Sequence, residues 1–442
     1  MAFLDENGLA IYTRKIKDAL SLTPVIVANV TTGSVATATY EDYRVVALSV
    51  NGKAELSLPS YGHWTVSATL NGKTTSSVVV NVEAAVRYPI NLYYSDIWGV
   101  EWDKTSTTTW TRTDSAQFFV DPTPYTAGSL SYGSPFDDVY PWKEMEIVEN
   151  VSVGTMVKIP KYWYKWTDTA NSLKLQIANH PEDGFSVSPA HAARYSGDRE
   201  KDYILVGRYH CNSNYMSAAG QAPITNITRS LARNKIHEKG QYVFQCDFAT
   251  FWTIRMLYLV EFADWDSQNV IGHGCGDNSG KVVMGYTDSM PYHTGTTQNL
   301  RTSFGYGTQY RNIEGLWDNC FDWCDGIYFL NENIYIIDNP NAFDDAIGGT
   351  YIGQRPLTAG FPIKYAVPSN SNYSWALFPQ ELGDGSPLTY TTDMYYSYST
   401  GTVLYTGSSF NQSNLRGAFY LNTEYKSTST ATNIGCRPQI LV

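Results

Sequence analysis

The stretch from Arg311 to Ile327, "RNIEGLWDNCFDWCDGI", is the most informative part of this chain. Three aromatic residues, Trp317, Phe321 and Trp323, alternate there with Asp and Asn, and glycines bracket them. Aromatic side chains bury large apolar areas, and Asp and Asn side chains hydrogen-bond to nearby backbone groups. The pattern therefore predicts a buried aromatic turn, and we expect both tryptophans to be mostly buried.

Two predicted helices precede this turn. "ITRSLARNKIHEKG" (227–240) is typical of a helix that Thr225 or Thr228 caps and Gly240 ends. "DFATFWTIRMLYLVEFADWDSQ" (247–268) is apolar on nearly every face, which predicts a longer, buried helix. Upstream, "MVKIPKYWYKW" and "LKLQIAN" predict a hairpin, and short strands with Gly/Asn/Ser-rich loops follow the second helix. This order predicts an α+β domain.

Residues 24–95 have the alternating pattern of an all-β domain. Asn51-Gly52 and Asn71-Gly72 each separate two alternating runs, and Asn-Gly supplies the two positive-φ positions of a type I′ hairpin turn. Six or seven strands are enough for a small sandwich. The segment resembles the immunoglobulin-like modules of phage fibres and bacterial surface proteins, which implies a spacer or a docking unit.

The segment before this domain predicts one short helix over residues 5–21. Asp5 can cap it, and Leu9, Tyr12 and Ile16 recur at helical spacing. The helix either packs on its own domain or serves as an attachment and trimerisation segment, and the residues alone leave both open. The predicted organisation is a helix (1–22), an immunoglobulin-like sandwich (23–95), a Thr/Ser/Pro-rich lead-in (96–145) and a larger domain (146–442).

Composition excludes several classes of partner. The chain has 442 residues and a formal net charge of −11, whereas nucleic acids and anionic membranes attract clustered Lys and Arg. The N-terminus carries acids where a signal peptide carries bases, and no apolar run approaches the roughly 18 residues of a membrane span. We therefore expect no nucleic-acid binding, no membrane insertion and no signal peptide. The 34 tyrosines, together with Ser, Asn and Gly, are typical of protein-binding surfaces.

Motifs for catalysis and metal binding are weak. "IGHGCGDNSG" (271–280) is glycine-rich but follows a predicted helix instead of opening one, unlike a dinucleotide-binding loop. The seven histidines never fall at metal-binding spacing, and no GxSxG nucleophile motif is present. Cys320 and Cys324 lie four residues apart, but no second pair completes a zinc set, so we expect reduced structural thiols. We predict no catalytic residue, no metal site and no cofactor.

A resemblance to known proteins adds to this interpretation. "GLWDNCFDW" (315–323) is similar to the G-x-x-G-N-V-x-E-W segment of the formylglycine-generating-enzyme variety of the C-type lectin fold. "LYTGSSF" (404–410) and "NIGCRP" (433–438) resemble that family's closing segments. The first 20 residues and about 145–442 look like tail proteins of phages and prophages of gut bacteria. The resemblance implies a C-type lectin fold in the C-terminal domain.

Two departures from related patterns argue against other functions. The enzyme needs a pair of cysteines near the chain end to bind copper, and this chain has Cys436 alone there. This chain also lacks the E-P-N and W-N-D signatures of calcium-dependent lectins. Catalysis is therefore not expected.

Some of these phage proteins are variable proteins of diversity-generating retroelements, such as the phage major tropism determinant. Adenine-directed mutagenesis changes Asn-type codons near their C-terminus, and Tyr, Ser, Asp, Phe, His and Cys codons are reachable from Asn. Residues 390–442 contain Tyr/Ser/Asn-rich runs between three segments predicted as scaffold strands, "VLYTG", "GAFYLN" and "NIGCRP". The resemblance implies that these runs face a ligand, although any Tyr/Ser/Asn-rich loop would have this composition.

The sequence therefore predicts a phage receptor-binding adhesin, located in the virion, with a bacterial surface receptor (protein or glycan) and other tail proteins as partners. We expect a homotrimer. An oxidase of the formylglycine-generating kind and a purely structural virion protein are the alternatives. The predicted ligand-binding residues are Tyr395, Tyr396, Ser397, Tyr398, Ser399, Ser409, Asn411, Gln412, Ser413, Asn414, Arg416, Glu424, Tyr425, Lys426, Ser427 and Ser429. We expect eight of these side chains to lie together on one solvent-facing patch: Tyr395, Tyr396, Tyr398, Asn411, Asn414, Arg416, Tyr425 and Lys426.

Overall fold

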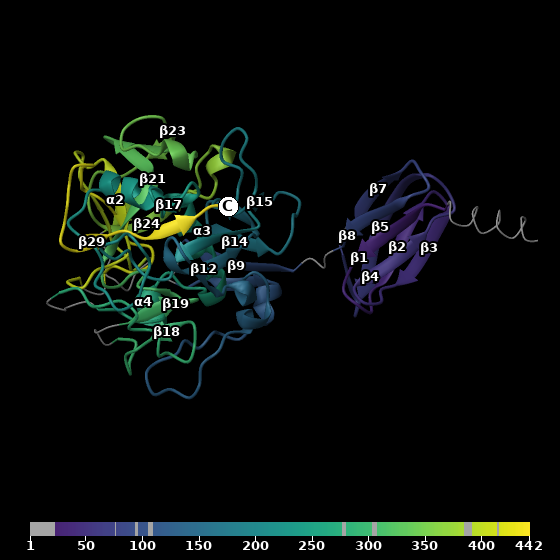
Figure 1. The fold of residues 1–442 in the computed structure, drawn as a ribbon, viewed down its shortest axis with the longest axis horizontal. Helices are drawn as coiled ribbons and strands as arrows, with labels where there is room; N and C mark the ends of the chain where they lie inside the picture. Colours follow the sequence, from purple (N-terminus) through teal and green to yellow (C-terminus); the bar gives the residue numbers. More distant parts are fainter. Residues whose placement is uncertain are drawn as a thin grey trace, which may run out of the picture. The chain divides into compact units, whose positions relative to one another are not determined.

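The chain divides into two units, Met1–Asp96 and Ile97–Val442, in this computed structural model (Figure 1). Both units consist mostly of β-sheet, and the larger one adds a few helices. The predicted helix at residues 5–21 and the predicted site residues Ser413 and Asn414 lie outside the described residues. The structure describes residues 23–75, 77–92, 96–104, 109–275, 280–302, 307–383, 391–412 and 415–442.

The smaller unit consists of two sheets around one core. One sheet has the order β3-β2-β5-β6, with β7 also paired to β5, and the other has the order β4-β1-β8. Trp64 and Val66 from the first sheet share a core with Ile26 and Leu56 from the second. The strands are β1 Val25–Asn29, β2 Val35–Tyr40, β3 Tyr43–Leu48, β4 Lys53–Ser57, β5 Gly62–Leu70, β6 Lys73–Thr74, β7 Val78–Val82 and β8 Arg87–Asn91.

Of the two hairpins predicted at Asn-Gly turns, one is present in the structure and the other is not. Asn71 and Gly72 both have positive φ, and the turn joins the paired strands β5 and β6, so the predicted hairpin is confirmed. Asn51 and Gly52 also have positive φ, but β3 belongs to one sheet and β4 to the other. The hairpin predicted there is wrong, because β4 pairs with β1 along its whole length and a single bridge closes the turn.

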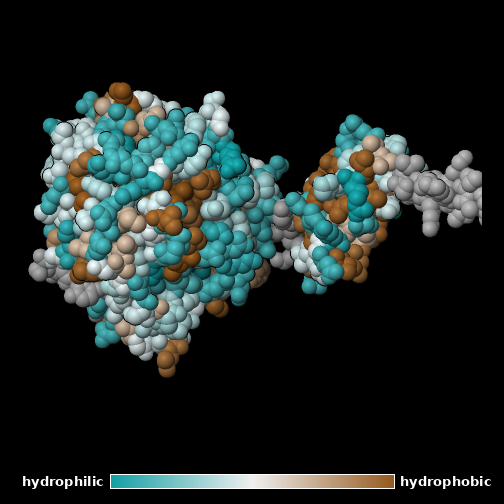
Figure 2. Space-filling model, in the orientation of Figure 1, coloured by the Kyte–Doolittle hydropathy of each residue, from teal (hydrophilic) through white to brown (hydrophobic). Residues whose placement is uncertain are grey.

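The smaller unit leaves apolar side chains exposed. Val46 and Leu48 of β3, together with Val79 of β7, are at least half exposed. Figure 2 shows apolar patches, in brown, on the visible face of this unit. β3 is an edge strand of its sheet, so part of this surface lies beside unpaired backbone groups.

Three main sheets form the larger unit. Their orders are β10-β9-β14-β13-β15, β11-β12-β16-β30-β17 and β23-β22-β21-β27-β28-β26, the last with β29 also paired to β21. The first has β9 Ile97–Asp103, β10 Thr111–Asp114, β13 Trp163–Asp168, β14 Ser172–Ala178 and β15 Ser186–Val187. The second has β11 Ile147–Asn150, β12 Gly154–Pro160, β16 Tyr203–Gly207, β17 Val243–Gln245 and β30 Pro438–Ile440. The third has β21 Phe321–Leu330, β22 Asn333–Ile336, β23 Thr350–Gln354, β26 Tyr395–Ser397, β27 Val403–Thr406, β28 Leu421–Thr423 and β29 Ile434–Gly435.

Small sheets and short helices complete the unit. The small sheets contain β18 Gly295–Thr296, β19 Thr308–Tyr310, β20 Ile313–Glu314, β24 Phe361–Ala366 and β25 Phe378–Gly383. The α-helices are α2 Arg229–His237, α3 Phe248–Phe262 and α4 Ser267–Val270, and the 3-10 helices are η1 Ser115–Phe118, η2 Pro135–Asp138, η3 Trp142–Glu144, η4 Pro340–Ala342 and η5 Ser371–Tyr373.

The segment predicted as a lead-in (96–145) contributes strands and buried side chains to the core of this unit. β9 lies between β10 and β14, and Trp98, Val100 and Trp102 on it are buried. The hairpin predicted around residues 156–179 is confirmed for β13 and β14. β12 turns away from that hairpin and pairs with β11 and β16 in the second sheet.

The helix α3 lies at the centre of the larger unit. All of its residues are buried, as predicted, and it contacts β9 and β14 on one side and β21 on another. Asp247 caps its first turn, and α2 begins at the predicted cap Thr228. α3 ends at Phe262, so the prediction that it extends to residue 268 is wrong. Ala263 adopts a left-handed conformation, and the carboxylates of Asp264 and Asp266 accept the amide N–H groups of Asp266 and Asn269, which starts the separate turn α4.

The aromatic turn is buried as predicted. Trp317 and Trp323 are almost inaccessible to solvent, and their indole N–H groups donate to the carbonyls of Gly272 (3.0 Å) and Ile227 (2.9 Å). Asp318 accepts hydrogen bonds from four backbone N–H groups, those of Cys275, Gly307, Thr308 and Asn319. The polar residues of the turn thus satisfy the surrounding backbone, and β21 begins within this stretch, at Phe321.

Candidate functional site

Three short strands, β26, β27 and β28, bring the polar runs of the C-terminal segment together. β28 pairs with β27 on one side and with β26 on the other. Tyr405, Asn422 and Tyr396 are direct partners across these strands, so they form one row. Side chains opposite each other in neighbouring strands point to the same face, so this row presents two phenols and an amide on one side of the sheet.

The same alternation buries part of the predicted site. Tyr395 and Ser397 flank Tyr396 on β26 and point to the opposite, buried face. The Tyr395 ring packs against Phe378, and its hydroxyl lies 3.2 Å from the hydroxyl of Thr423. Tyr395 and Ser397 are therefore scaffold residues, and the prediction that they face a ligand on a solvent-facing patch is wrong.

Ser409 is also buried, contrary to the prediction. Its hydroxyl donates to the side-chain oxygen of Asn411 (2.9 Å), and the amide of Asn433 donates to both. These contacts join the loop after β27 to the segment before β29. A buried hydroxyl that is bonded to neighbouring loop side chains organises the loop instead of presenting a ligand contact.

A hollow of about 230 Å³ lies over the row, and we call it the C-terminal pocket. Five predicted site residues from three separate polar runs line it: Tyr396, Gln412, Arg416, Glu424 and Tyr425. The other lining residues are Phe321, Tyr405, Tyr420, Asn422 and Asn433.

Arg416 is the cation of this pocket. Its guanidinium carbon lies 5.0 Å from the ring centre of Tyr420 and 5.9 Å from that of Phe321, which stack on each other. Within the described parts of the chain no carboxylate pairs with Arg416, and its Nε–H is buried without an acceptor. A guanidinium held against aromatic rings with free N–H donors suits the recognition of carboxylate, phosphate or hydroxyl groups.

Glu424 is the acid of the pocket. One of its oxygens accepts the hydroxyl of Tyr405 (2.6 Å) and the amide of Asn422 (3.2 Å). Burial raises the pKa of Tyr405 far above its ordinary value and raises the pKa of Tyr420 to about 12, so both phenols stay protonated and can donate. The pocket therefore offers a cation, a carboxylate and several hydroxyl groups within one small space.

The remaining predicted residues lie outside the pocket lining. Tyr398 is exposed, and its hydroxyl lies 3.1 Å from that of Tyr396, which extends the aromatic surface. The backbone N–H of Lys426 donates to the hydroxyl of Ser429, which forms a turn that follows Tyr425. Ser399, Asn411 and Lys426 are exposed, and Ser427 and Ser429 are half-buried.

Five lining residues were not predicted from the sequence. Tyr405, Tyr420 and Asn422 lie in the segments "VLYTG" and "GAFYLN", which were predicted as scaffold strands, and Phe321 lies in the aromatic turn. Alternation within "VLYTG" and "YLNTE" was the available signal, because every second side chain of a sheet strand faces the same side. Asn433 carried no local signal.

The thiols of Cys211 and Cys436 are buried and do not line the C-terminal pocket. In the described residues no group of three or more His, Cys, Asp or Glu side chains could hold a metal ion. Burial raises the pKa of Cys436, and the neighbouring Cys211 adds to the effect, which opposes the thiolate that metal binding requires. The pocket is equipped to bind polar groups.

Comparison with known proteins adds no family assignment. No protein-family model matches the chain, and a search of curated proteins found no significant match. Across the described ranges, no helix is both long and apolar enough to cross a membrane.

Proposed function

We propose that this protein is a receptor-binding adhesin of a phage tail that displays a diversified surface on a C-type lectin scaffold. The larger unit would be the C-type lectin domain, and the smaller unit would be an immunoglobulin-like spacer. A bacterial surface receptor, protein or glycan, would bind at the C-terminal pocket. In the virion, other tail proteins would be the structural partners.

One observation carries the proposal: side chains from three separate polar runs line one pocket. Tyr396 comes from the first run, Gln412 and Arg416 from the second, and Glu424 and Tyr425 from the third. The strands between them supply buried side chains such as Leu404 and Leu421. Buried and pocket-facing side chains alternate along these strands. The pocket-facing residues can therefore be substituted without changing the core residues, as a diversified binding surface requires.

The chemistry of the pocket suits protein or glycan recognition. Tyr and Arg are enriched among residues that dominate binding energy, since they offer large contact area at modest entropic cost. Arg416 has donors available, and one oxygen of Glu424 accepts no hydrogen bond from the described residues. Both groups can therefore bind a partner without breaking an ion pair in the free protein.

The retroelement origin has a direct test in the neighbouring DNA. We expect a reverse-transcriptase gene close by and a near-copy of the 3′ end that differs at adenine positions. Those differences should fall in the codons of pocket residues such as Tyr396 and Tyr425, and spare the buried Tyr395. Differences confined to buried positions would contradict the proposal.

Binding to whole cells tests the adhesin directly. The triple variant Tyr396→Ser, Arg416→Ser, Tyr425→Ser should lose binding to the bacterium that the wild-type protein recognises in a panel of gut strains. Because these side chains are at least partly exposed, we expect the melting temperature to shift by only a few degrees.

The matched control replaces two tyrosines that lie away from the pocket. Tyr242 and Tyr351 are about half exposed in the same unit, and neither lines the C-terminal pocket. The variant Tyr242→Ser, Tyr351→Ser should bind cells as the wild type does. Retained binding by the triple variant, or equal loss in the control, would place the receptor site elsewhere.

The oxidase alternative depends on a copper-binding pair of thiols. Cys436 lies beside Cys211, and the Cys211 amide donates to the Cys436 carbonyl (2.8 Å). Both thiols are buried, and the raised pKa of Cys436 favours the protonated form, so the geometry supports the adhesin more strongly. A purely structural virion protein would leave the pocket without a ligand, and cell binding distinguishes this case.

A further inference from the structure

A second pocket lies elsewhere in the larger unit, and we call it the Asp338 pocket. Its volume is about 520 Å³, within the range of roughly 300–1,000 Å³ that is typical of small-molecule sites. Its walls come from the loop before Arg194, the start of α3, the middle of β21, the end of β22 and η5. It shares no lining residue with the C-terminal pocket.

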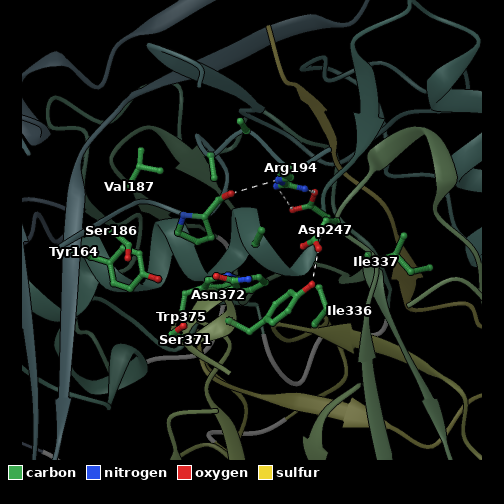
Figure 3. A pocket seen from close by; sticks show the side chains of 17 residues that line it. Tyr164, Ser186, Val187, Arg194, Asp247, Ile336, Ile337, Ser371, Asn372 and Trp375 are labelled. Atoms are coloured by element: carbon green, nitrogen blue, oxygen red, sulfur yellow. Dashed lines mark hydrogen bonds and ion pairs between the residues drawn. The ribbon is translucent and has the colours of Figure 1, made fainter. Parts of the chain in front are cut away.

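Aromatic side chains form much of the buried wall. Tyr164, Tyr373 and Trp375 line the pocket and are almost inaccessible, and the rings of Tyr373 and Trp375 lie 6.5 Å apart. Ser186 and Asn372 lie at an exposed rim, so solvent reaches the pocket. Figure 3 shows Tyr164 and Ser186 at one side and Arg194 with Asp247 at the other.

Arg194 and Asp247 neutralise each other. Their side chains form a buried ion pair with N–O distances of 2.6 and 3.3 Å, drawn as dashed lines in Figure 3. Asp247 also accepts the amide N–H of Thr250 and the side-chain amide of Gln439, so both of its oxygens are occupied. Burial opposes its ionisation, but Arg194 and these hydrogen bonds outweigh burial and lower its pKa.

Asp338 is different, because it faces the pocket without a counter-ion. One oxygen accepts the hydroxyl of Tyr373 (2.5 Å), and no Lys, Arg or His in the described parts of the chain forms an ion pair with the carboxylate. Burial raises its pKa, and Tyr373 and the more distant Arg194 oppose this effect. The charged side chains of the lining are one guanidinium and two carboxylates, which leaves one negative charge in excess.

These features define the ligand by its charge and its shape. An anion would be repelled by the Asp338 carboxylate. A neutral apolar molecule would displace water from this carboxylate without offering a hydrogen bond in return, which costs free energy. A cation on an apolar stem can form a charge-assisted hydrogen bond with the free carboxylate oxygen and place its stem against the aromatic wall. Arg194 does not prevent this arrangement, since Asp247 already compensates its charge.

We propose that the Asp338 pocket binds an organic cation, a primary ammonium or guanidinium group on an apolar stem, with the cation at Asp338 and the stem beside Tyr373 and Trp375. The cation can be a free small amine or the side chain of a lysine or arginine in a peptide. Both sources share this chemistry, and the experiment distinguishes them.

The test compares matched probes on the full chain by calorimetry and ligand-observed NMR at pH 7 and low salt. Pentylammonium should bind, pentanol should bind at least tenfold more weakly, and pentanoate should not bind. A blocked Ala-Lys-Ala peptide tests the peptide-borne source. Tighter binding of the peptide than of pentylammonium assigns the site to a peptide side chain, and the reverse order assigns it to a free amine.

Variants then locate the site. Asp338→Asn keeps the size of the side chain and an acceptor for Tyr373, and it should weaken pentylammonium binding at least tenfold. Trp375→Leu should also weaken it, through loss of the aromatic wall. Asp121→Asn removes a mostly exposed carboxylate that does not line the pocket, and it should leave binding unchanged.

Two results would overturn the proposal. One is equal binding of pentylammonium and pentanol to the wild-type protein, which would remove the role of charge. The other is unchanged affinity in Asp338→Asn with a wild-type melting curve, which would place any amine elsewhere. Neither result depends on the adhesin function, because cell binding is tested at the C-terminal pocket.

Discussion

Replacing Arg437 by methionine should strongly destabilise the larger unit. Arg437 is completely buried in the segment between β29 and β30, and its guanidinium joins parts of the chain that are far apart in the sequence. Its Nε donates to Asp322 (3.2 Å), and its two terminal nitrogens donate to the carbonyls of Gly207 (2.9 Å), Arg208 (3.0 Å), Glu314 (2.9 Å) and Gly315 (3.2 Å).

The magnitude follows from the groups that lose their partner. Methionine fills a similar volume but donates no hydrogen bond, so the Asp322 carboxylate stays buried without its cation. Removing one partner of a buried ion pair typically costs about 3–5 kcal/mol, and the four carbonyls lose their donors as well. We expect Arg437→Met to lower the free energy of unfolding by roughly 4 kcal/mol at pH 8.

A nearby histidine makes this loss depend on pH. Nε2 of His210 lies 3.5 Å from the Asp322 carboxylate, and burial lowers the pKa of His210 to about 4, with Asp322 opposing the shift and Arg437 adding to it. A histidine whose folded pKa lies below its unfolded value costs stability as pH falls through about 6.5. Without Arg437 the folded pKa of His210 should rise, so this cost shrinks. The deficit of Arg437→Met should therefore be smaller at pH 5 than at pH 8.

Urea unfolding followed by tryptophan fluorescence measures the effect. Eleven of the twelve tryptophans belong to the larger unit, and Trp64 alone lies in the smaller one, so the signal reports the larger unit. The control is Lys364→Met, which breaks an exposed ion pair with Glu381 and should cost at most about 1 kcal/mol. A deficit of Arg437→Met below about 1 kcal/mol would show that the buried ion pair contributes little to stability, and a deficit that grows toward pH 5 would exclude the proposed role of His210.

Four further predictions concern the core, a buried acid, assembly and metal content. Trp323→Ala should cost about 3–5 kcal/mol through a cavity, and an unchanged urea midpoint would contradict its buried position. Burial, with a contribution from Asp266, raises the pKa of Asp393 to about 7. The folded state therefore holds the Asp393 proton more tightly than the unfolded state. The stability that the protonated Asp393 contributes falls as pH rises from about 4 to 7. The wild type should therefore be more stable relative to Asp393→Asn at pH 5 than at pH 8, and a difference that is constant with pH would exclude this role. Deleting residues 1–22 should reduce a trimer to smaller species by light scattering without lowering the melting temperature, whereas a full-length monomer at micromolar concentration would remove this prediction. Elemental analysis should find no stoichiometric copper or zinc, and one equivalent of copper held by cysteine would favour the oxidase instead.

Local signals in the sequence predicted several elements correctly. Thr228, a predicted cap, caps α2, and the apolar run after Asp247 forms the buried helix α3 as predicted. The alternation of Trp317 and Trp323 with polar residues predicted their burial. Each of these features depends on residues within one or two turns of each other, so a linear pattern contains the necessary information.

The failures share a different cause. Asn51-Gly52 forms the predicted turn, but the partner of β4 is β1, which precedes it by a loop and two strands. Ala263 ends α3 early, where Trp265 stacks on Tyr365 and packs against Phe419. In both cases, contacts with other segments oppose the structure that the local pattern predicts.

The candidate site was predicted in part for the same reason. Polar composition identified the runs that contain Tyr396, Arg416 and Tyr425, and these residues line the pocket. Composition could not decide which side of β26 faces the core, so it grouped Tyr395 with Tyr396. A shift of one residue along a strand reverses every side chain, and the pairing of β26 with β28 sets that register.

By itself, the amino-acid sequence determined where the principal helices begin, where one tight hairpin turns and which large aromatic residues avoid water, because nearby residues decide these properties. The tertiary structure alone decided strand partners, the row of Tyr405, Asn422 and Tyr396, and the buried contacts of Arg437. It also placed Arg194, Asp338 and Trp375 around one cavity. The physical reason is that strand pairing and burial depend on segments separated by long stretches of chain, whose meeting is determined by the packing of the whole core around α3.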